Sequence, residues 1–166
     1  MAGTRRGWGS VRKFPSGRWQ ARYLDPETRR MVPAPQTFSS KTAADRWLAK
    51  KRTELDAGTA VDDRTGKRPL RDWWPDYWQN IQSNKARTLA NYRASWTKRI
   101  EPRFGDMPVM RIKPRLIDAW IADMIAEGVS AAKAGETVGV LKRVLDLAVR
   151  DRAIPTNPCL QRSVKL

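Results

Sequence analysis

Arginine and glutamine alternate with aromatic and small side chains between residues 18 and 24. In an extended strand, side chains two residues apart share a face, which puts Arg18, Gln20 and Arg22 together. Arginine's planar fork can bond guanine O6 and N7 at once, so this pattern favours a sheet face that reads the major groove of DNA. The alternative is an ordinary solvated face. The candidates on the sheet are Arg12, Arg18, Gln20 and Arg22, with Lys13, Arg29 and Arg30 expected on phosphates.

A second polar stripe occurs in the C-terminal half, at helical spacing. Its members recur at i, i+4, i+8 and i+11, opposite an apolar stripe of Leu89, Tyr92 and Trp96. Such a face could cross or enter a groove of DNA, and the alternative is the solvent side of an ordinary helix. The stripe consists of Arg87, Asn91, Ser95 and Lys98, with Lys85 and Thr88 at its leading end.

The overall charge also indicates a polyanionic partner. The 166 residues contain 33 basic and 17 acidic side chains, for a net charge of +16. Residues 1–68 carry +9 and residues 69–166 carry +7, so both halves are expected to contact nucleic acid. An apolar content of 40%, with eight tryptophans, indicates a folded protein and argues against a disordered basic tail.

The residue types present argue against an active enzyme. With no histidine and one cysteine, the sequence has no ligand set for a structural zinc and no internal disulfide. A general acid or base would have to be a carboxylate, a lysine, a tyrosine or Cys159, and no carboxylate pair, phosphate loop or nucleophile elbow is present. We therefore expect no catalytic residue, metal or cofactor. Cys159 is interpreted as a packing residue.

The elements that position the first stripe are expected to form a small sheet with one helix. Strands are predicted at 11–14, 18–24 and 30–38, the last at an outer edge because its two prolines lack N–H donors. Ser39 and Ser40 precede a helix over 41–57 that would cover the aromatic face of the sheet. The arginine face is left bare.

A linker over 58–69 is followed by four predicted helices. The helices are expected at 70–81, from 88 to the proline at 102, at 114–127 and at 130–150, and they would form a compact bundle. The fold class is thus α+β, with domains at 1–57 and 70–154 and a tail at 155–166. No stretch is long and apolar enough for a membrane span or a signal peptide, which predicts a soluble cytoplasmic protein.

Several motifs then resemble a known family. The segments GSVRKFPSGRWQARYLDPETRR and TFSSKTAADRWLA resemble the N-terminal arm-binding domain of phage tyrosine integrases. The T-L-x-x-Y opening at Thr88, the I-x-P-x-F-G-D run at Ile100 and the A-V-R-D-x-x-I-x-x-N-P run at Ala148 are similar to the SAM-like core-binding domain of the same integrases. The resemblance covers residues 8–160.

The resemblance implies binding of double-stranded DNA during site-specific recombination and integration of a viral genome. The sheet would bind arm sites and the helices core sites, with the last helix presenting Lys133, Thr137, Lys142 and Arg143. Family members continue into a catalytic domain with arginines, a lysine, a histidine motif and a nucleophilic tyrosine, which we expect to be absent here. The implied partners are other integrase protomers, a DNA-bending host factor and an excision factor, and the implied location is the nucleoid.

A standalone RNA-binding or regulatory DNA-binding protein is the alternative reading. The net positive charge of the sequence is compatible with either kind of protein. RNA-binding sheets usually expose aromatic side chains for stacking on unpaired bases, whereas the expected bare face is rich in arginine.

Overall fold

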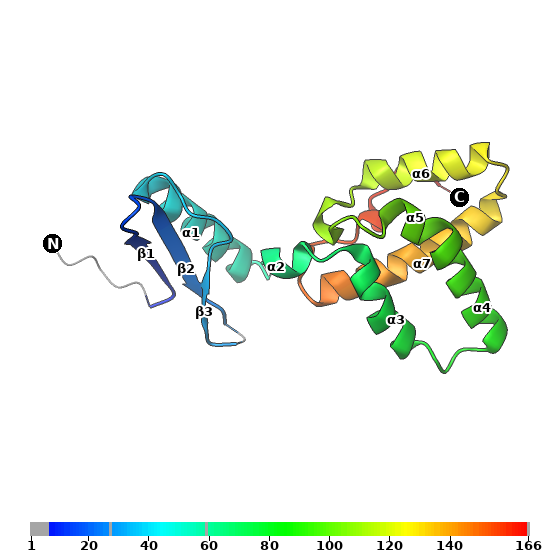
Figure 1. Cartoon of the computed structure of the whole chain (residues 1–166), viewed down its shortest axis with the longest axis horizontal. Helices are drawn as coiled ribbons and strands as arrows, with labels where there is room; N and C mark the ends of the chain where they lie inside the picture. The colour runs from blue at the N-terminus through cyan, green and yellow to red at the C-terminus, as the bar shows by residue number, and fades with distance from the viewer. Residues whose placement is uncertain (1–6, 27, 59, 166) are drawn as a thin grey trace. The chain divides into compact units, whose positions relative to one another are not determined.

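The computed structural model describes residues 7–26, 28–58 and 60–165 (Figure 1). Residues 1–6 of the expected first domain lie outside them. The chain forms two units, Met1–Ala60 and Val61–Leu166, and each has its own hydrophobic core. The first combines a three-stranded sheet with a helix and the second is helical, so the α+β class is confirmed. None of the helices within the described residues is both long and apolar enough to cross a membrane.

The sheet of the first unit is antiparallel, in the order β1 (Gly9–Lys13), β2 (Trp19–Leu24) and β3 (Met31–Pro33). β3 lies at an edge, as expected, but it is shorter than expected and ends at Pro33, after which the Ala34 N–H still donates to the Ala21 carbonyl of β2 at 2.8 Å. The chain then rejoins β2 through a bridge between Phe38 and Trp19, in which both N–H···O distances are 2.8 Å.

The helix α1 (Lys41–Asp56) covers one face of this sheet (Figure 1). It begins where the Ser40 hydroxyl accepts a hydrogen bond from the backbone N–H of Ala43, and it ends before Gly58, whose φ of 67° suits glycine. The small core between helix and sheet contains Ala21, Tyr23, Phe38, Ala44 and Leu48. The opposite face of the sheet is left uncovered by α1.

The second unit consists of helices joined by short turns. In chain order they are α2 (Asp63–Gly66), the 3-10 turn η1 (Leu70–Trp73), α3 (Trp74–Asn80), α4 (Ala86–Ser95), the π turn η2 (Trp96–Ile100), α5 (Glu101–Phe104), the 3-10 turn η3 (Val109–Arg111), α6 (Pro114–Ala126), α7 (Ala131–Arg150) and the 3-10 turn η4 (Pro158–Leu160).

Most of the segment expected to be a linker, residues 58–69, is folded into the second unit. Asp62 caps α2 inside this segment and accepts from the backbone N–H of Arg64 at 2.9 Å. The Asp62 N–H donates to the carbonyl of Arg152, and the Val109 N–H donates to the carbonyl of Arg68. Turn-forming residues and charges in the sequence concealed these backbone contacts, which make residues 61–69 part of the second unit.

The two long helices lie where they were expected, at 114–127 and 130–150, and each buries one apolar stripe. On α6, the buried side chains are Ile117, Trp120, Ile121 and Met124. On α7, which Ser130 caps, the whole stripe from Ala134 to Ala148 is buried. The first bundle helix, expected at 70–81, starts differently: the 3-10 turn η1 precedes α3, and Pro75 lies in the first turn of α3.

A π turn interrupts the second predicted helix after Ser95. It contains more residues per turn than an α-helix, so the spacing of the stripe changes there. Ser95, which ends α4, and Trp96, which begins the π turn, are both buried, with 1% and 2% of their surfaces exposed.

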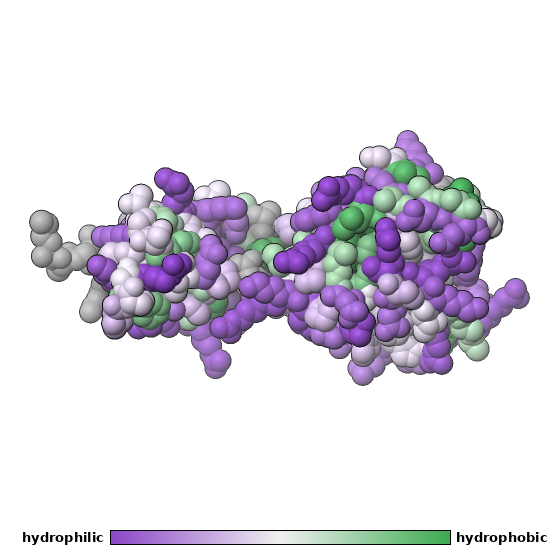
Figure 2. Space-filling model, turned by 45° about the horizontal axis from the view of Figure 1, so that its top comes forward, coloured by the Kyte–Doolittle hydropathy of each residue, from purple (hydrophilic) through white to green (hydrophobic). Residues whose placement is uncertain are grey.

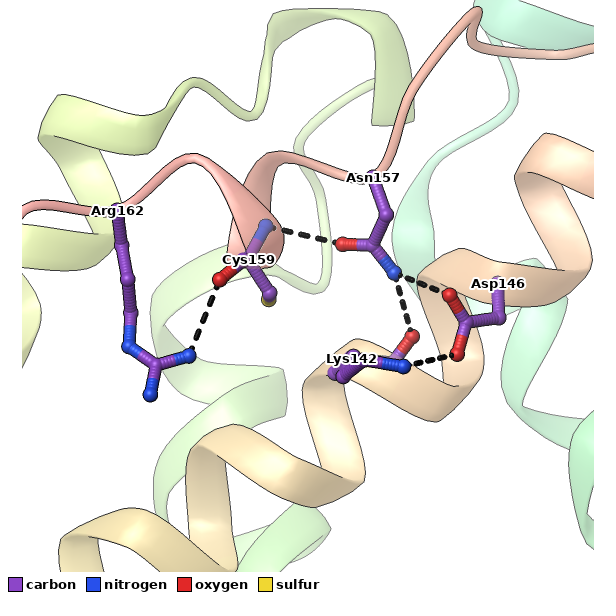
Figure 3. A network of polar contacts seen from close by, with 5 residues as sticks. All are labelled: Lys142, Asp146, Asn157, Cys159 and Arg162. Atoms are coloured by element: carbon purple, nitrogen blue, oxygen red, sulfur yellow. Dashed lines mark hydrogen bonds and ion pairs between the residues drawn. The ribbon is translucent and has the colours of Figure 1, made fainter. Parts of the chain in front are cut away.

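The segment after α7 is packed against the second unit instead of forming a free tail. Figure 3 shows Asn157 at its centre: the amide nitrogen donates to the Lys142 carbonyl at 2.8 Å and to Asp146 at 2.7 Å. The amide oxygen accepts from the backbone N–H of Cys159 at 2.9 Å. Further along, the Asp118 carboxylate accepts the backbone N–H of Val164 at 2.9 Å. The expected tail at 155–166 is thus held in place up to residue 164.

Candidate nucleic-acid interface

The bare face of the sheet carries three of the four expected candidates on its strands. The β1–β2 register places Arg12 directly opposite Gln20, and Arg22 opposite Ser10 on the same face. The Arg12 Nε donates to Gln20 Oε1 at 2.9 Å, and its guanidinium lies 4.9 Å from the ring centroid of Phe14. These contacts orient the arginine through Nε and leave its two terminal nitrogens for a partner.

Arg18 and Arg22 are also held by acceptors near the sheet edge. Arg18 Nε donates to the Thr37 hydroxyl at 2.5 Å and its terminal nitrogen to the Thr37 carbonyl at 2.6 Å. Arg22 donates to the Met31 carbonyl at 3.4 Å. Each contact restrains a flexible side chain before any ligand binds, which reduces the entropy lost on binding.

Charge is segregated within the first unit. The three strands contain no acidic residue. Among the described residues of the unit, the acidic side chains are Asp25 in the β2–β3 turn, and Asp45, Glu54 and Asp56 on α1. Since α1 covers the other face, the arginine face presents cations without interleaved carboxylates. This face can attract a polyanion.

The three residues expected on phosphates lie off the arginine face of the sheet. The register pairs Lys13 with Trp19, on the helix side, and its Nζ lies 5.9 Å from that ring centroid. The sequence pattern placed Lys13 next to Arg12, but adjacent residues on a strand point to opposite faces. Arg29 and Arg30 lie in the β2–β3 turn, where Arg29 has a φ of 54°. Both are exposed.

Only part of the polar stripe expected on the second predicted helix lies at the surface. Lys85, Arg87 and Asn91 are exposed on the first two turns, whereas Thr88 is half-buried. Ser95 was wrongly expected at the surface, because it lies three residues after Tyr92 and so borders the buried stripe of the helix. Lys98 is exposed but lines a small hollow with Asp123 and Glu127 of α6.

The candidates on α7 are mostly engaged within the protein. Lys133 pairs with Glu136 at 2.9 Å and Lys142 with Asp146 at 2.8 Å. Thr137 is fully buried and donates to the Lys133 carbonyl at 2.8 Å, so its expected place at the surface was wrong. It lies beside the apolar stripe, and its hydroxyl is satisfied by the preceding helical turn.

Arg143 is the exposed α7 candidate, and it points toward α4. Its guanidinium lies 5.2 Å from the ring centroid of Tyr92, and one of its nitrogens would lie 3.2 Å from a Cβ placed at Gly139. Glycine at 139 therefore leaves room for this arginine. The contact places one cation of α7 beside Tyr92 of α4.

Sequence reasoning missed Arg93, which also rests on an aromatic ring. Its guanidinium lies 4.6 Å from the ring centroid of Trp78 on α3. Arg93 falls outside the i, i+4 stripe, and the contact joins residues 15 positions apart across a turn, so spacing alone held no signal for it. Trp78 in turn lies 5.2 Å from Trp74, which stacks on Trp96 at 4.4 Å.

The described residues offer little for covalent or metal chemistry. They contain no group of three or more acidic or thiol side chains placed to hold a metal ion. Burial raises the pKa of Cys159 to about 12, so its thiol stays protonated and unreactive near neutral pH. Burial also raises the pKa of Tyr77, whose hydroxyl is not exposed. The exposed chemistry is that of arginine, lysine and amide donors.

Comparison with known families identifies both units. Residues 7–57 match the model described as phage integrase, N-terminal domain, and residues 70–125 match the model described as phage integrase, N-terminal SAM-like domain. By these two domains, the chain belongs to the phage integrase family. The family expected from the sequence motifs is thus confirmed.

Integrases of mycobacteria and their phages are similar to this integrase chain along nearly its whole length. It is 33% identical over 160 residues to the phiRv2 prophage integrase of Mycobacterium tuberculosis, covering 93% of this chain and 41% of that protein. It is 32% identical over 165 residues to the integrase of Mycobacterium phage D29, covering 96% of this chain and 44% of that protein. The chain therefore spans about two-fifths of the length of these relatives.

Two solved structures share the fold of the integrase chain. A lambda integrase dimer bound to a COC′ core site matches with a TM-score of 0.55, and a lambda integrase tetramer bound to a Holliday junction matches with a TM-score of 0.53. In both, the identity is 23%, and the match covers 94% of this chain and 45% of the other. The likeness supports the same order of sheet unit and helical unit.

Proposed function

We propose that this chain is the DNA-binding N-terminal region of a site-specific tyrosine recombinase that integrates phage DNA. The observation that carries the proposal is the arginine face of the sheet, where Arg12, Gln20 and Arg22 lie on strands free of acidic residues. The sheet unit binds arm-type sites and the helical unit binds core-type sites.

The sheet face suits the major groove of duplex DNA, which is wide enough for a small sheet and carries distinguishable donors and acceptors. Arg12 and Arg22 supply forks for guanine, and Gln20 supplies an amide beside them. The aromatic side chains Trp19 and Tyr23 pack toward α1 and are not presented on this face for stacking on unpaired bases. This arrangement favours duplex DNA over single-stranded RNA.

The helical unit contributes a separate cationic surface. Lys85, Arg87 and Asn91 of α4 lie at the exposed side of the helix. Arg93 and Arg143 are supported on aromatic rings. Phosphate contacts from these side chains would position the unit, and few of them would read bases.

Strand cleavage by the whole recombinase would rely on residues outside these 166. The sequence contains no histidine, and its three tyrosines are Tyr23, Tyr77 and Tyr92. The first two are buried and the third is half-buried under Arg143. We therefore assign binding to this region. Other protomers, a DNA-bending host factor and an excision factor are the proposed partners of the whole recombinase.

A salt titration with duplex DNA tests the proposal. If about six to ten phosphates are neutralised, affinity should fall by about 10³- to 10⁵-fold between about 50 and 200 mM salt. Arg22→Ala should lower discrimination between selected and random duplexes by about 1–3 kcal/mol. A flat salt response, or equal affinity for single-stranded RNA, would contradict the proposal.

A matched control separates the sheet face from general charge. Lys50 is an exposed residue of α1. The Lys50→Ala substitution removes one positive charge, as Arg22→Ala does. Lys50→Ala should leave discrimination unchanged. If Arg22→Ala loses as much affinity on random as on selected duplexes while Lys50→Ala loses none, Arg22 contacts the backbone and not a base. Equal losses by both variants would mean that only overall charge matters.

A further inference from the structure

The arginine face of the sheet also carries an aromatic side chain, that of Phe14. This residue directly follows β1 and continues its pairing, since its N–H donates to the Arg18 carbonyl at 2.7 Å. Side chains two residues apart share a face of a strand, which puts Phe14 on the same face as Arg12. The ring contact agrees, because the Arg12 guanidinium lies 4.9 Å from the ring centroid of Phe14.

Core packing does not account for Phe14. Among the described residues, the half-buried apolar side chains that pack against the core of the first unit include Val11 of β1 and Trp19 of β2, but not Phe14. The Phe14 side chain is itself half-buried. Small apolar areas between hydrophilic side chains are visible on the first unit in Figure 2. An aromatic ring outside the core and beside a cation is available to a ligand of the arginine face.

The ring and the guanidinium are placed to contact neighbouring bases. Arg12 is oriented by Oε1 of Gln20 and by the ring of Phe14, and its terminal nitrogens can bond O6 and N7 of a guanine in the major groove. Successive base pairs of a duplex are about 3.4 Å apart. A ring centred 4.9 Å from the guanidinium therefore reaches the base pair next to that guanine.

We propose that Phe14 contacts the C5 methyl group of a thymine in the base pair next to the guanine bound by Arg12. The inference rests on the proposed function and deepens it, because it names a base step that the sheet recognises. In the major groove the methyl group distinguishes thymine from the other bases, and phenylalanine is among the side chains that contact it. Cytosine would present an amino donor to a ring without an acceptor, so the same contact disfavours cytosine.

Replacing one thymine by deoxyuridine tests the contact at a single methyl group. Duplexes are first selected from a randomised library with the full chain. The guanine bound by Arg12 is then the position whose preference Arg12→Ala abolishes. Deoxyuridine in place of the thymine beside it should lower affinity about fourfold, the factor that corresponds to burial of one CH₂ or methyl group.

Three variants separate the methyl contact from simple support of Arg12. Phe14→Ala should bind the thymine and deoxyuridine duplexes equally. Phe14→Leu should keep most of the difference, because leucine still presents apolar surface to the methyl group. Lys13→Ala is the matched control at the neighbouring residue, whose side chain lies on the helix side of the sheet, and it should keep the full difference. Both Phe14 variants should unfold at an unchanged temperature, since Phe14 lies outside the core.

Failure of the methyl contact differs from failure of the proposed function. If the selection enriches no duplex and affinity does not respond to salt, DNA binding itself fails, and the thymine contact fails with it. If duplexes are enriched but no guanine preference depends on Arg12, no thymine lies beside that guanine, or deoxyuridine binds as well as thymine, the thymine contact alone is overturned. Loss of the guanine preference in Phe14→Ala, with no effect of the methyl group in the unaltered chain, would make Phe14 a support for Arg12 and overturn the contact too.

Discussion

The Nε of Arg12 on β1 donates to Oε1 of Gln20 on β2 across the strand pair, at 2.9 Å. The two side chains therefore form one unit on the arginine face. Gln20→Ala should weaken sequence discrimination by removing its own amide and by releasing Arg12 from its oriented position.

The coupling can be measured with a double-mutant cycle on selected and random duplexes. Arg12→Ala and Gln20→Ala together should lose less discrimination than the sum of the single variants, by about 0.5–3 kcal/mol. Additive losses would mean that the two side chains act independently.

Ser95 provides a prediction in the opposite direction. Its Oγ is buried and has no hydrogen-bond partner in the described structure, and removing an unsatisfied buried hydroxyl relieves its desolvation cost. Ser95→Ala should therefore keep or raise the free energy of unfolding, by up to about 1 kcal/mol, and leave DNA affinity unchanged. Thermal unfolding and a DNA titration check both values.

Asn91→Ala is the matched variant on the same helix, since Asn91 is exposed. It should lower DNA affinity without changing the unfolding temperature. If Ser95→Ala weakens DNA binding as much as Asn91→Ala does, the buried position of Ser95 is wrong.

Asp118 makes the end of the chain sensitive to acid. The backbone N–H groups of Val164 and Ser163 donate to its carboxylate and hold its pKa below the usual value of 3.8. The stabilisation is fully present above that usual value and is lost as the pH falls through the lowered pKa, because the protonated carboxyl is a weaker acceptor.

The amide proton shifts of Ser163 and Val164 should therefore change together in a low-pH NMR titration, with a midpoint below 3.8. Asp118→Asn should abolish this step, because the amide does not titrate. A midpoint at or above the usual value would show that the two backbone contacts do not form.

Limited proteolysis tests how the segment from 58 to 69 is organised. Backbone hydrogen bonds join residues 62–68 to the second unit, so Arg64 and Lys67 should resist trypsin in spite of their exposed side chains. A protease of broad specificity should cut around Ala57 and Gly58 first. Rapid tryptic cleavage at Arg64 would restore the longer linker predicted from composition.

Periodicity predicted the elements whose geometry is regular over several turns. The helix predicted at 130–150 is α7, whose apolar stripe from Ala134 to Ala148 is buried, and the alternation from Arg18 to Leu24 separated the two faces of β2. These predictions succeed because one regular repeat decides which side of the element is buried.

Departures from a regular repeat were not visible in the sequence. Trp73 is fully buried, because the 3-10 turn repeats every three residues and places it on the side of Leu70. Ser95, which ends α4 just before the π turn, borders the apolar stripe and is also buried. For the site, spacing identified Arg12, Gln20 and Arg22, but the ring contacts of Arg93 and Arg143 depend on tertiary packing.

The two hydrophobic cores have no residue in common. A substitution that loosens the packing of Leu48 therefore has no direct route to Leu141, and each unit can drift in sequence under its own constraint. Each unit can therefore gain or lose stability in its own core while the other keeps the packing that supports its surface. Separate cores would thus let the two surfaces proposed to bind DNA change independently within one polypeptide.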